Sequence, residues 1–326
     1  WLSRITTIYL GGIKTINKEL DYGDIVQFIF YINMLTWPFA SVGWVSSLIQ
    51  RAAASQKRIN EFINIEEKVI DNGNKVISEI LELEFKNVGF KYPNSQEYVL
   101  KDISFKIKTG ETLGIFGKTG SGKSSLAQIL CRLYKISNGE ILINGISIDE
   151  IDLKKYREEI GYVPQDVFLF SDSIQSNIAF GLNEEEFNFE DIKIAAEKAG
   201  LKSEIERFKE NYQTKIGERG VTLSGGQKQR ISIARALIRN PQLLIFDDCL
   251  SAVDSETSRK IQKSLNKKDN NKISIQISHK ISNISECDHI IVLEDGGICE
   301  EGNHENLIKN KGFYYEIFKK QQLEEN

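Results

Sequence analysis

The sequence has few cysteines and no excess of positive charge, and both shortages narrow the possible functions. Its four cysteines, Cys131, Cys249, Cys287 and Cys299, are scattered without a CxxC pair or a metal-ligand spacing. We therefore expect reduced, cytosolic thiols. Lysine and arginine number 42 against 46 acidic residues, a net charge of −4, so the composition does not indicate a nucleic-acid partner.

Charge is also missing from the 26 residues between Asp24 and Arg51. As a helix this run would span about 39 Å at about 1.5 Å per residue, enough to cross a bilayer. A buried helix of a soluble protein is the alternative, but such helices seldom run this long without a charge. Gln27, Asn33 and Pro38 within the run suggest that one face meets other helices or a polar pathway.

The segments around this run indicate how the chain is divided. Arg51, Lys57 and Arg58 place its C-terminal end in the cytoplasm. We expect the end of a transmembrane domain over residues 1–50, with residues 14–24 as a short external loop. A connector helix and linker should follow over 51–78, and a soluble domain over 79–326. Because the chain opens on Trp1 without an initiator methionine, it is expected to be a piece of a longer protein.

The soluble part has the pattern of an α/β domain. "LELEF" alternates with period two, as a half-buried strand does, whereas "LLIF" and "ISIQIS" are apolar throughout, as buried parallel strands are. "VLKDISFKIKTGETLGIFG" predicts two strands around the turn at Thr109 and Gly110, and "HIIVLEDGGICEEG" predicts a hairpin. These patterns predict an α/β core with a small antiparallel sheet at its start.

A phosphate-binding loop lies within this domain. "GKTGSGKSS" fits GxxxxGK[ST], with Gly117, Gly122, Lys123 and Ser124 at the defining positions, between a predicted strand and a predicted helix. The backbone N–H groups of such a loop surround phosphate oxygens, the lysine contacts the β- and γ-phosphates, and the hydroxyl binds Mg²⁺. An ordinary glycine-rich turn would not need this strand–loop–helix context.

A second nucleotide motif follows about 120 residues later. Asp247 ends the apolar strand "LLIF", where a carboxylate can hold Mg²⁺ beside the phosphate loop. Between the two motifs stands "LSGGQ", Leu223 to Gln227, followed by "KQRISIARAL". In this order the motifs resemble those of the ATP-binding cassette (ABC) transporters. The resemblance implies a P-loop (RecA-like) core with an antiparallel β-subdomain and a helical signature subdomain, preceded by one transmembrane helix and a connector helix.

The resemblance extends to single residues, and three of them also have a simpler interpretation. Tyr92 matches the aromatic that stacks on adenine, although it could be an ordinary strand aromatic. Gln165 matches the glutamine that touches Mg²⁺ or water, although it could be a surface amide. Residues 217–220 match a segment that contacts membrane-domain loops, and Asp254 matches a loop that communicates across the dimer. His279 matches the switch histidine that contacts the γ-phosphate, although a lone histidine is more often structural.

The resemblance also assigns roles to a set of residues, with ATP and Mg²⁺ as cofactors. The expected ATP-binding residues are Tyr92, Gly117, Lys118, Thr119, Gly120, Ser121, Gly122, Lys123, Ser124, Ser125, Gln165, Asp247 and His279. Those expected to act in hydrolysis are Asp248, His279 and Gln165, and the expected Mg²⁺ ligands are Ser124, Gln165 and Asp247. Those expected to cap the ATP of the opposite subunit are Leu223, Ser224, Gly225, Gly226 and Gln227.

One position departs from the family's pattern. Asp248 stands where the family has the glutamate that polarises the attacking water. Aspartate is one methylene shorter, which withdraws the carboxylate by about 1.5 Å, whereas general-base action needs hydrogen-bond reach of about 2.6–3.2 Å. We therefore expect this chain to bind ATP well and to hydrolyse it slowly, as the degenerate-site subunit of a heterodimer. A slow homodimer, or backbone shifts that let Asp248 act as the base, are the alternatives.

The sequence thus predicts a subunit of an ABC-type exporter that drives export by nucleotide-dependent dimerisation of its cassettes. The expected partners are a second half-transporter, the lipid bilayer and an unidentified exported substrate, with no nucleic acid. The expected location is the cell membrane, crossed several times by the full-length protein, with the nucleotide-binding domain in the cytoplasm. A non-transport ABC ATPase acting on DNA or ribosomes would share the motifs, but the uncharged run before the cassette argues against it. A regulatory ATP-binding subunit is the third possibility.

Overall fold

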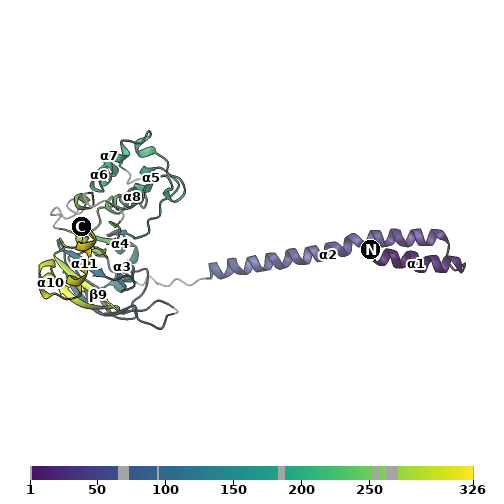
Figure 1. The fold of residues 1–326 in the computed structure, drawn as a ribbon, viewed down its shortest axis with the longest axis horizontal. Coiled ribbons are helices and arrows are strands. Elements are labelled where there is room, and N and C mark those ends of the chain that lie inside the picture. Colours follow the sequence, from purple (N-terminus) through teal and green to yellow (C-terminus); the bar gives the residue numbers. More distant parts are fainter. Residues whose placement is uncertain are drawn as a thin grey trace. The chain divides into compact units, whose positions relative to one another are not determined.

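A computed structural model describes residues 2–64, 73–93, 95–182, 188–251, 253, 257–261 and 271–325. The chain forms two compact units, Trp1–Glu67 and Lys68–Asn326 (Figure 1). The division between them falls within the expected connector, residues 51–78. Each unit is described by itself.

The first unit is a pair of helices, α1 (Leu2–Ile16) and α2 (Tyr22–Ile63), which pack against each other. Asp21 and Asp24 form a capping box that starts α2 at Tyr22, so the connection is shorter than the predicted loop over residues 14–24. A Cβ on Gly11 of α1 would lie 3.0 Å from Ile25 of α2, so the absence of a side chain allows the helices to approach closely.

The uncharged run and the predicted connector form one continuous helix. In the described part of the chain, α2 is long and apolar enough to cross a membrane, and none of its side chains is buried within this unit. Large apolar side chains such as Trp37, Phe39 and Trp44 are at least two-thirds exposed. Asn33, a polar residue within the run, accepts a hydrogen bond from Arg4 of α1. One polar position therefore meets another helix, as expected.

The second unit contains a six-stranded sheet. Its strands, in the order β10-β9-β3-β8-β7-β6, are β10 (Gly297–Gly302), β9 (His289–Glu294), β3 (Thr112–Gly117), β8 (Ile273–Ser278), β7 (Leu243–Asp247) and β6 (Ile160–Val163). All neighbouring pairs are parallel except β9 and β10, which form the predicted hairpin. Every residue of β3, β7 and β8 is buried, as expected for strands covered on both faces.

A smaller antiparallel sheet contains β2 (Leu100–Lys108), β1 (Glu82–Phe90), β4 (Asn138–Ile143) and β5 (Ile146–Ser147), in that order. "LELEF" comprises Leu81 and the first four residues of β1, where half-buried and buried positions alternate, as predicted. The turn at Thr109 and Gly110 carries the chain from this sheet into β3 of the larger one. The expected antiparallel sheet at the start of the domain is present.

Helices complete the second unit. In the described part of the chain they include α3 (Lys123–Leu130), α4 (Leu153–Glu158), α5 (Ile174–Ala179), α6 (Phe189–Lys198), α7 (Lys202–Ile205), α8 (Gly225–Leu237), α10 (His304–Asn310) and α11 (Phe313–Glu325), with short 3₁₀ turns at Ile148–Glu150, Asn211–Gln213, Glu218–Gly220 and Ile281–Asn283. Helices α5, α6 and α7 gather around α8 over a common apolar core, so the predicted helical subdomain is present (Figure 1).

Candidate nucleotide-binding site

The candidate site lies where four neighbouring parallel strands end. The phosphate loop follows β3, residue 279 follows β8, Asp248 follows β7, and Gln165 lies two residues beyond β6. Because these strands are adjacent and parallel in the order β3-β8-β7-β6, their carboxyl ends share one edge of the sheet. Ligands in open α/β sheets bind at this edge.

The phosphate loop has a backbone that favours glycine. Gly120 and Gly122 have φ values of 87° and 99°, which L side chains rarely adopt. A Cβ on Gly117 would lie 2.4 Å from the carbonyl oxygen of Leu293, so that position has no room for a side chain. Helix α3 begins at Lys123 without a side-chain cap, which leaves its first N–H groups for a phosphate.

Lys123 is held at the centre of this loop. Its Nζ donates hydrogen bonds of 2.7 Å to the carbonyl oxygens of Gly117 and Lys118. Burial lowers the pKa of Lys123, and the carboxylates of Asp248 and Asp247 oppose that change. The ammonium therefore lies near the loop backbone, where a phosphate would bind.

Asp247 faces the phosphate loop from β7. Its Oδ1 accepts a 3.1 Å hydrogen bond from Ser124, its Oδ2 accepts a 3.3 Å bond from Tyr162, and only 2% of the residue is exposed. Burial raises the pKa of Asp247, while the bonds from Ser124 and Tyr162 act in the opposite direction. A hydroxyl and a carboxylate side by side are the oxygen donors that Mg²⁺ prefers.

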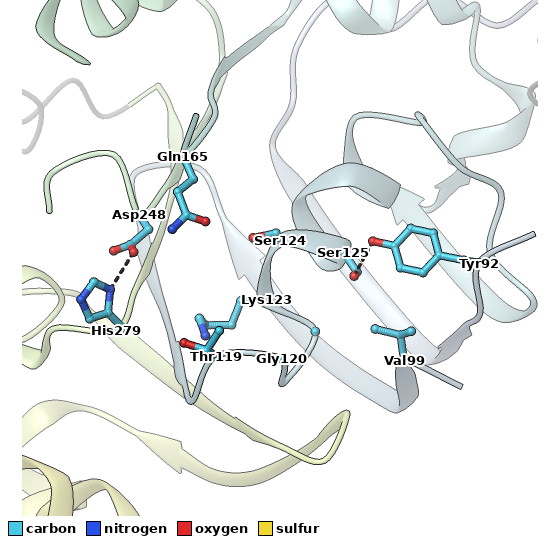
Figure 2. A pocket seen from close by; sticks show the side chains of 11 residues that line it. Tyr92, Val99, Thr119, Gly120, Lys123, Ser124, Ser125, Gln165, Asp248 and His279 are labelled. Atoms are coloured by element: carbon cyan, nitrogen blue, oxygen red, sulfur yellow. Dashed lines mark hydrogen bonds and ion pairs between the residues drawn. The ribbon is translucent and has the colours of Figure 1, made fainter. Parts of the chain in front are cut away.

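Asp248 points toward a different segment. Its Oδ2 lies 2.6 Å from Nδ1 of His279 (Figure 2). Its Oδ1 accepts a 3.3 Å hydrogen bond from Ser278. Its backbone is left-handed, with a φ of 49°, and 8% of the residue is exposed. The two adjacent aspartates thus bond different segments. Asp247 bonds the phosphate loop, and Asp248 bonds the last residue of β8 and the residue after it.

Tyr92 lies at the end of the pocket away from His279 (Figure 2). Its hydroxyl lies 2.8 Å from that of Ser125 and donates a 3.0 Å bond to Gln128, and its ring packs edge-on against Tyr134. Tyr92 is therefore held to α3 by hydrogen bonds as well as by ring packing, unlike an ordinary strand aromatic. Its stacking on adenine stays a prediction.

Most of these residues line one pocket of about 420 Å³, whereas Asp247 lies behind it and bonds the lining residue Ser124. Its lining contains Tyr92, Val99, Thr119, Gly120, Gly122, Lys123, Ser124, Ser125, Gln165, Asp248 and His279. The hydroxyl of Ser121, within the loop, is buried without a hydrogen-bond partner in the described part of the chain. A glycine cradle, an ammonium, an unpaired hydroxyl and a hydroxyl–carboxylate pair fit a nucleotide phosphate and Mg²⁺.

The signature residues do not line this pocket. Ser224 caps α8 and forms a capping box with Gln227, in which each side chain bonds the backbone N–H of the other residue. Leu223 is buried in the helical subdomain, and Gly225 and Gly226 form the first turn of α8. Their expected role toward another subunit stays a prediction, and Asp254 lies outside the described residues.

Two residues of the site were missed by the sequence reasoning. Tyr162 bonds Asp247 because β6 and β7 are neighbours, and Val99 lines the pocket from just before β2. A tyrosine two residues before the "PQ" of Gln165, at the end of a predicted strand, could have indicated the first. No pattern in the sequence distinguishes Val99.

Comparisons with known proteins agree with this geometry. Residues 100–251 match the family model described as ABC transporter. The probable multidrug resistance ABC transporter ATP-binding/permease protein YheI of Bacillus subtilis is 39% identical over 314 residues, covering 96% of this chain and 53% of that protein. The multidrug resistance-like ATP-binding protein MdlA of Escherichia coli is 35% identical, covering 99% of this chain and 54% of that protein.

Among solved structures, a bacterial Atm1-family ABC exporter with ATP bound matches with a TM-score of 0.77 and 33% identity, over 93% of this chain and 53% of that one. The chain spans about half the length of the curated relatives it matches. The family match covers both nucleotide motifs and the signature. With the ATP-bound solved structure it confirms the predicted fold class and the cofactors ATP and Mg²⁺. The relatives and the solved exporter confirm the predicted membrane location. The chain therefore contains an ABC transporter nucleotide-binding domain.

Proposed function

We propose that this chain is the ATP-binding, ATP-hydrolysing subunit of a membrane exporter. The observation that carries the proposal is the single pocket in which Lys123, Ser124, Gln165 and His279 converge, with Asp247 bonded to Ser124. In the proposed complex Lys123 contacts the β- and γ-phosphates, and Ser124, Asp247 and Gln165 hold Mg²⁺ directly or through water. His279 contacts the γ-phosphate, and Tyr92 stacks on the adenine. The bound metal supplies charge neutralisation.

The membrane part is proposed from length, composition and relatives. Residues 1–50 are the end of a transmembrane domain, residues 51–78 the connector, and residues 79–326 the nucleotide-binding domain on the cytoplasmic side. The support is the continuous helix α2, whose large apolar side chains are exposed within its own unit. The name of YheI joins an ATP-binding part to a permease, which supports a half-transporter, and the names of YheI and MdlA favour export of the multidrug type.

Two cassettes act together in this proposal. The signature residues lie outside the chain's own pocket, and Ser224 starts α8, so its hydroxyl and the first N–H groups of α8 are suited to the γ-phosphate of an opposite subunit. Each ATP is then held between one chain's phosphate loop and the other's signature. Dimerisation upon ATP binding drives the membrane part.

The chain's own ATP site is proposed to be the slow one. A general base must reach the attacking water at about 2.6–3.2 Å. The Asp248 carboxylate is short, and its two oxygens face Ser278 and His279. This supports an impaired base, and with it a heterodimer in which the partner's site performs most of the hydrolysis.

The substitution Asp248→Glu tests this assignment in the assembled transporter. With the partner's phosphate-loop lysine replaced, we expect the substitution to raise hydrolysis at the chain's own site about 10-fold or more, because base catalysis contributes about 10²–10⁴-fold. Asp248→Asn is the matched control and should not raise it. Unchanged hydrolysis in Asp248→Glu would contradict the impaired base.

The subunit composition is tested separately. Co-purification of two differently tagged copies of the full-length chain would indicate a homodimer, whereas recovery of a second half-transporter would support the heterodimer. If the purified wild-type complex fails to bind ATP with Mg²⁺, the exporter proposal itself is wrong.

A further inference from the structure

The last helix of the chain has a polar residue on its apolar face. In α11, Tyr314, Ile317 and Phe318 pack into an apolar cluster that includes Phe116 and Ile281. Gln321 follows Ile317 by four residues and Phe318 by three, so it shares their face of the helix. Gln321 is half-buried, so part of its amide lies away from water and is paired within the protein.

Gln321 finds both partners in the segment that follows β8. Its Nε2 donates a 2.7 Å hydrogen bond to the carbonyl oxygen of His279, and its Oε1 accepts a 2.9 Å bond from the N–H of Ile281. One amide thus bridges two backbone groups two residues apart. This arrangement satisfies both the donor and the acceptor of the side chain.

The bridged segment is the one that meets Asp248. His279 offers its carbonyl to Gln321 and its ring nitrogen to Asp248, at 2.6 Å. Ser278 bonds Asp248 as well, and it accepts hydrogen bonds from the N–H of Lys280 and from the side chain of Asn283. The direction of the His279 ring therefore depends on how its backbone is held.

Helix α11 is itself firmly anchored. The carboxylate of Glu300 accepts hydrogen bonds from the N–H groups of Phe313 and Tyr314 at its start. Tyr314 is fully buried, bonds His304 at 2.8 Å through its hydroxyl and packs edge-on against Phe116, with ring centroids 5.6 Å apart. Phe116 lies in β3, directly before the phosphate loop. The helix therefore joins the strand under the loop to the segment that contains His279.

We propose that Gln321 is a positioning residue that holds His279 in place for the γ-phosphate. This inference rests on the proposed function, in which His279 contacts that phosphate. In this proposal helix α11 fixes the backbone of residues 279–281 relative to β3. The His279 ring is then already in position before ATP binds. Gln321 touches neither ATP nor Mg²⁺ and acts through His279 alone.

The test compares two nucleotides in the full chain within its purified transporter. In Gln321→Met the length and helix preference of the side chain are kept while both hydrogen bonds are lost. We expect the affinity for a non-hydrolysable ATP analogue with Mg²⁺ to fall about 3- to 10-fold, the range of one net hydrogen bond, and the affinity for ADP to change less than about 2-fold. Lys320→Met, at the exposed preceding residue, is the control and should leave both affinities unchanged.

A second variant separates positioning from folding. Gln321→Glu keeps an acceptor for the Ile281 N–H but loses the donor to His279, so we expect the same selective loss of the ATP analogue. Faster hydrogen exchange at Ile281 in Gln321→Met would report the lost bond directly. Equal weakening of both nucleotides, or no change in either variant, would overturn the proposal. Failure of the wild-type complex to bind either nucleotide would instead count against the proposed function.

Discussion

The phosphate loop and the segment around His279 lie on the same edge of one sheet but are built in different ways. The loop is a continuous stretch, residues 117–125, in which Lys123 bonds carbonyls five and six residues away. The other side combines three distant segments, with Asp248 bonded to His279 and His279 bonded to Gln321. The loop's shape follows from neighbouring residues, whereas the His279 side depends on how the whole domain is packed.

The two adjacent aspartates show this difference within one dipeptide. Asp247 continues the extended strand and bonds Ser124 and Tyr162. Asp248 takes a left-handed backbone, which directs its carboxylate to the segment after β8. The first aspartate therefore belongs to the phosphate loop and the second to the His279 side.

The largest expected effect is on the phosphate loop. Replacement of Lys123 by alanine removes a half-buried ammonium from the centre of the phosphate loop, and we expect ATP to bind about 100-fold more weakly. Isothermal titration of the full chain in detergent would measure it. Lys135→Ala, at an exposed position just after α3, is the control and should bind as the wild type does. Near-normal ATP affinity in Lys123→Ala would mean that the phosphate loop does not hold ATP through this lysine.

A smaller effect separates the two aspartates. Asp247→Asn should reduce the Mg²⁺ affinity of the nucleotide complex about 10- to 100-fold, because it removes the charge beside Ser124. Asp248→Asn should change it less than about 3-fold, since that carboxylate faces His279. The Mn²⁺ dependence of ATP binding, followed by electron paramagnetic resonance, would show whether the two losses differ. Equal losses of Mg²⁺ affinity would mean that both aspartates contribute to metal binding.

The backbone of the loop predicts an effect on stability. Alanine at Gly122 would have a φ of 99° and a Cβ 2.6 Å from Leu100, so we expect a loss of about 2–3 kcal/mol. That loss corresponds to a Tm about 4–12 °C lower for a domain of this size. Gly145→Ala, at a φ of 78° but with nothing within 4 Å, should cost only about 1 kcal/mol. A Tm in Gly122→Ala no lower than that of the control would argue against the close approach.

The smallest expected effect is on the alkylation of two thiols, one near the phosphate loop and one near His279. Burial raises the pKa of Cys131, at the end of α3, to about 12, and it also raises the pKa of Cys249, next to Asp248. Both should resist alkylation at neutral pH, whereas the exposed Cys299 should react first. Mass spectrometry of briefly alkylated native protein would rank them. If Cys249 reacts well before Cys131, the His279 side opens more readily than the loop.

The sequence by itself determined the fold class and most of the pocket. Unbroken apolar runs predicted β7 and β8, and the spacing of Gly117, Gly122, Lys123 and Ser124 predicted the loop, because these features depend on periodicity and on local backbone chemistry. The resemblance to the ABC transporters, rather than the strand pattern, assigned Gln165, Asp248 and His279 to the same site. The structure brings these residues to one pocket, and their roles stay proposals.

Only the tertiary structure decided which groups meet across that edge. Tyr162 reaches Asp247 because β6 and β7 are neighbours, and Gln321 reaches His279 because α11 packs against the segment after β8. Nothing in the sequence around residues 279 and 321 connects them, since the contact joins positions 42 residues apart. A hydrogen bond between distant segments depends on the path of the chain between them, which local pattern does not encode. The direction of the Asp248 carboxylate depends on the same packing.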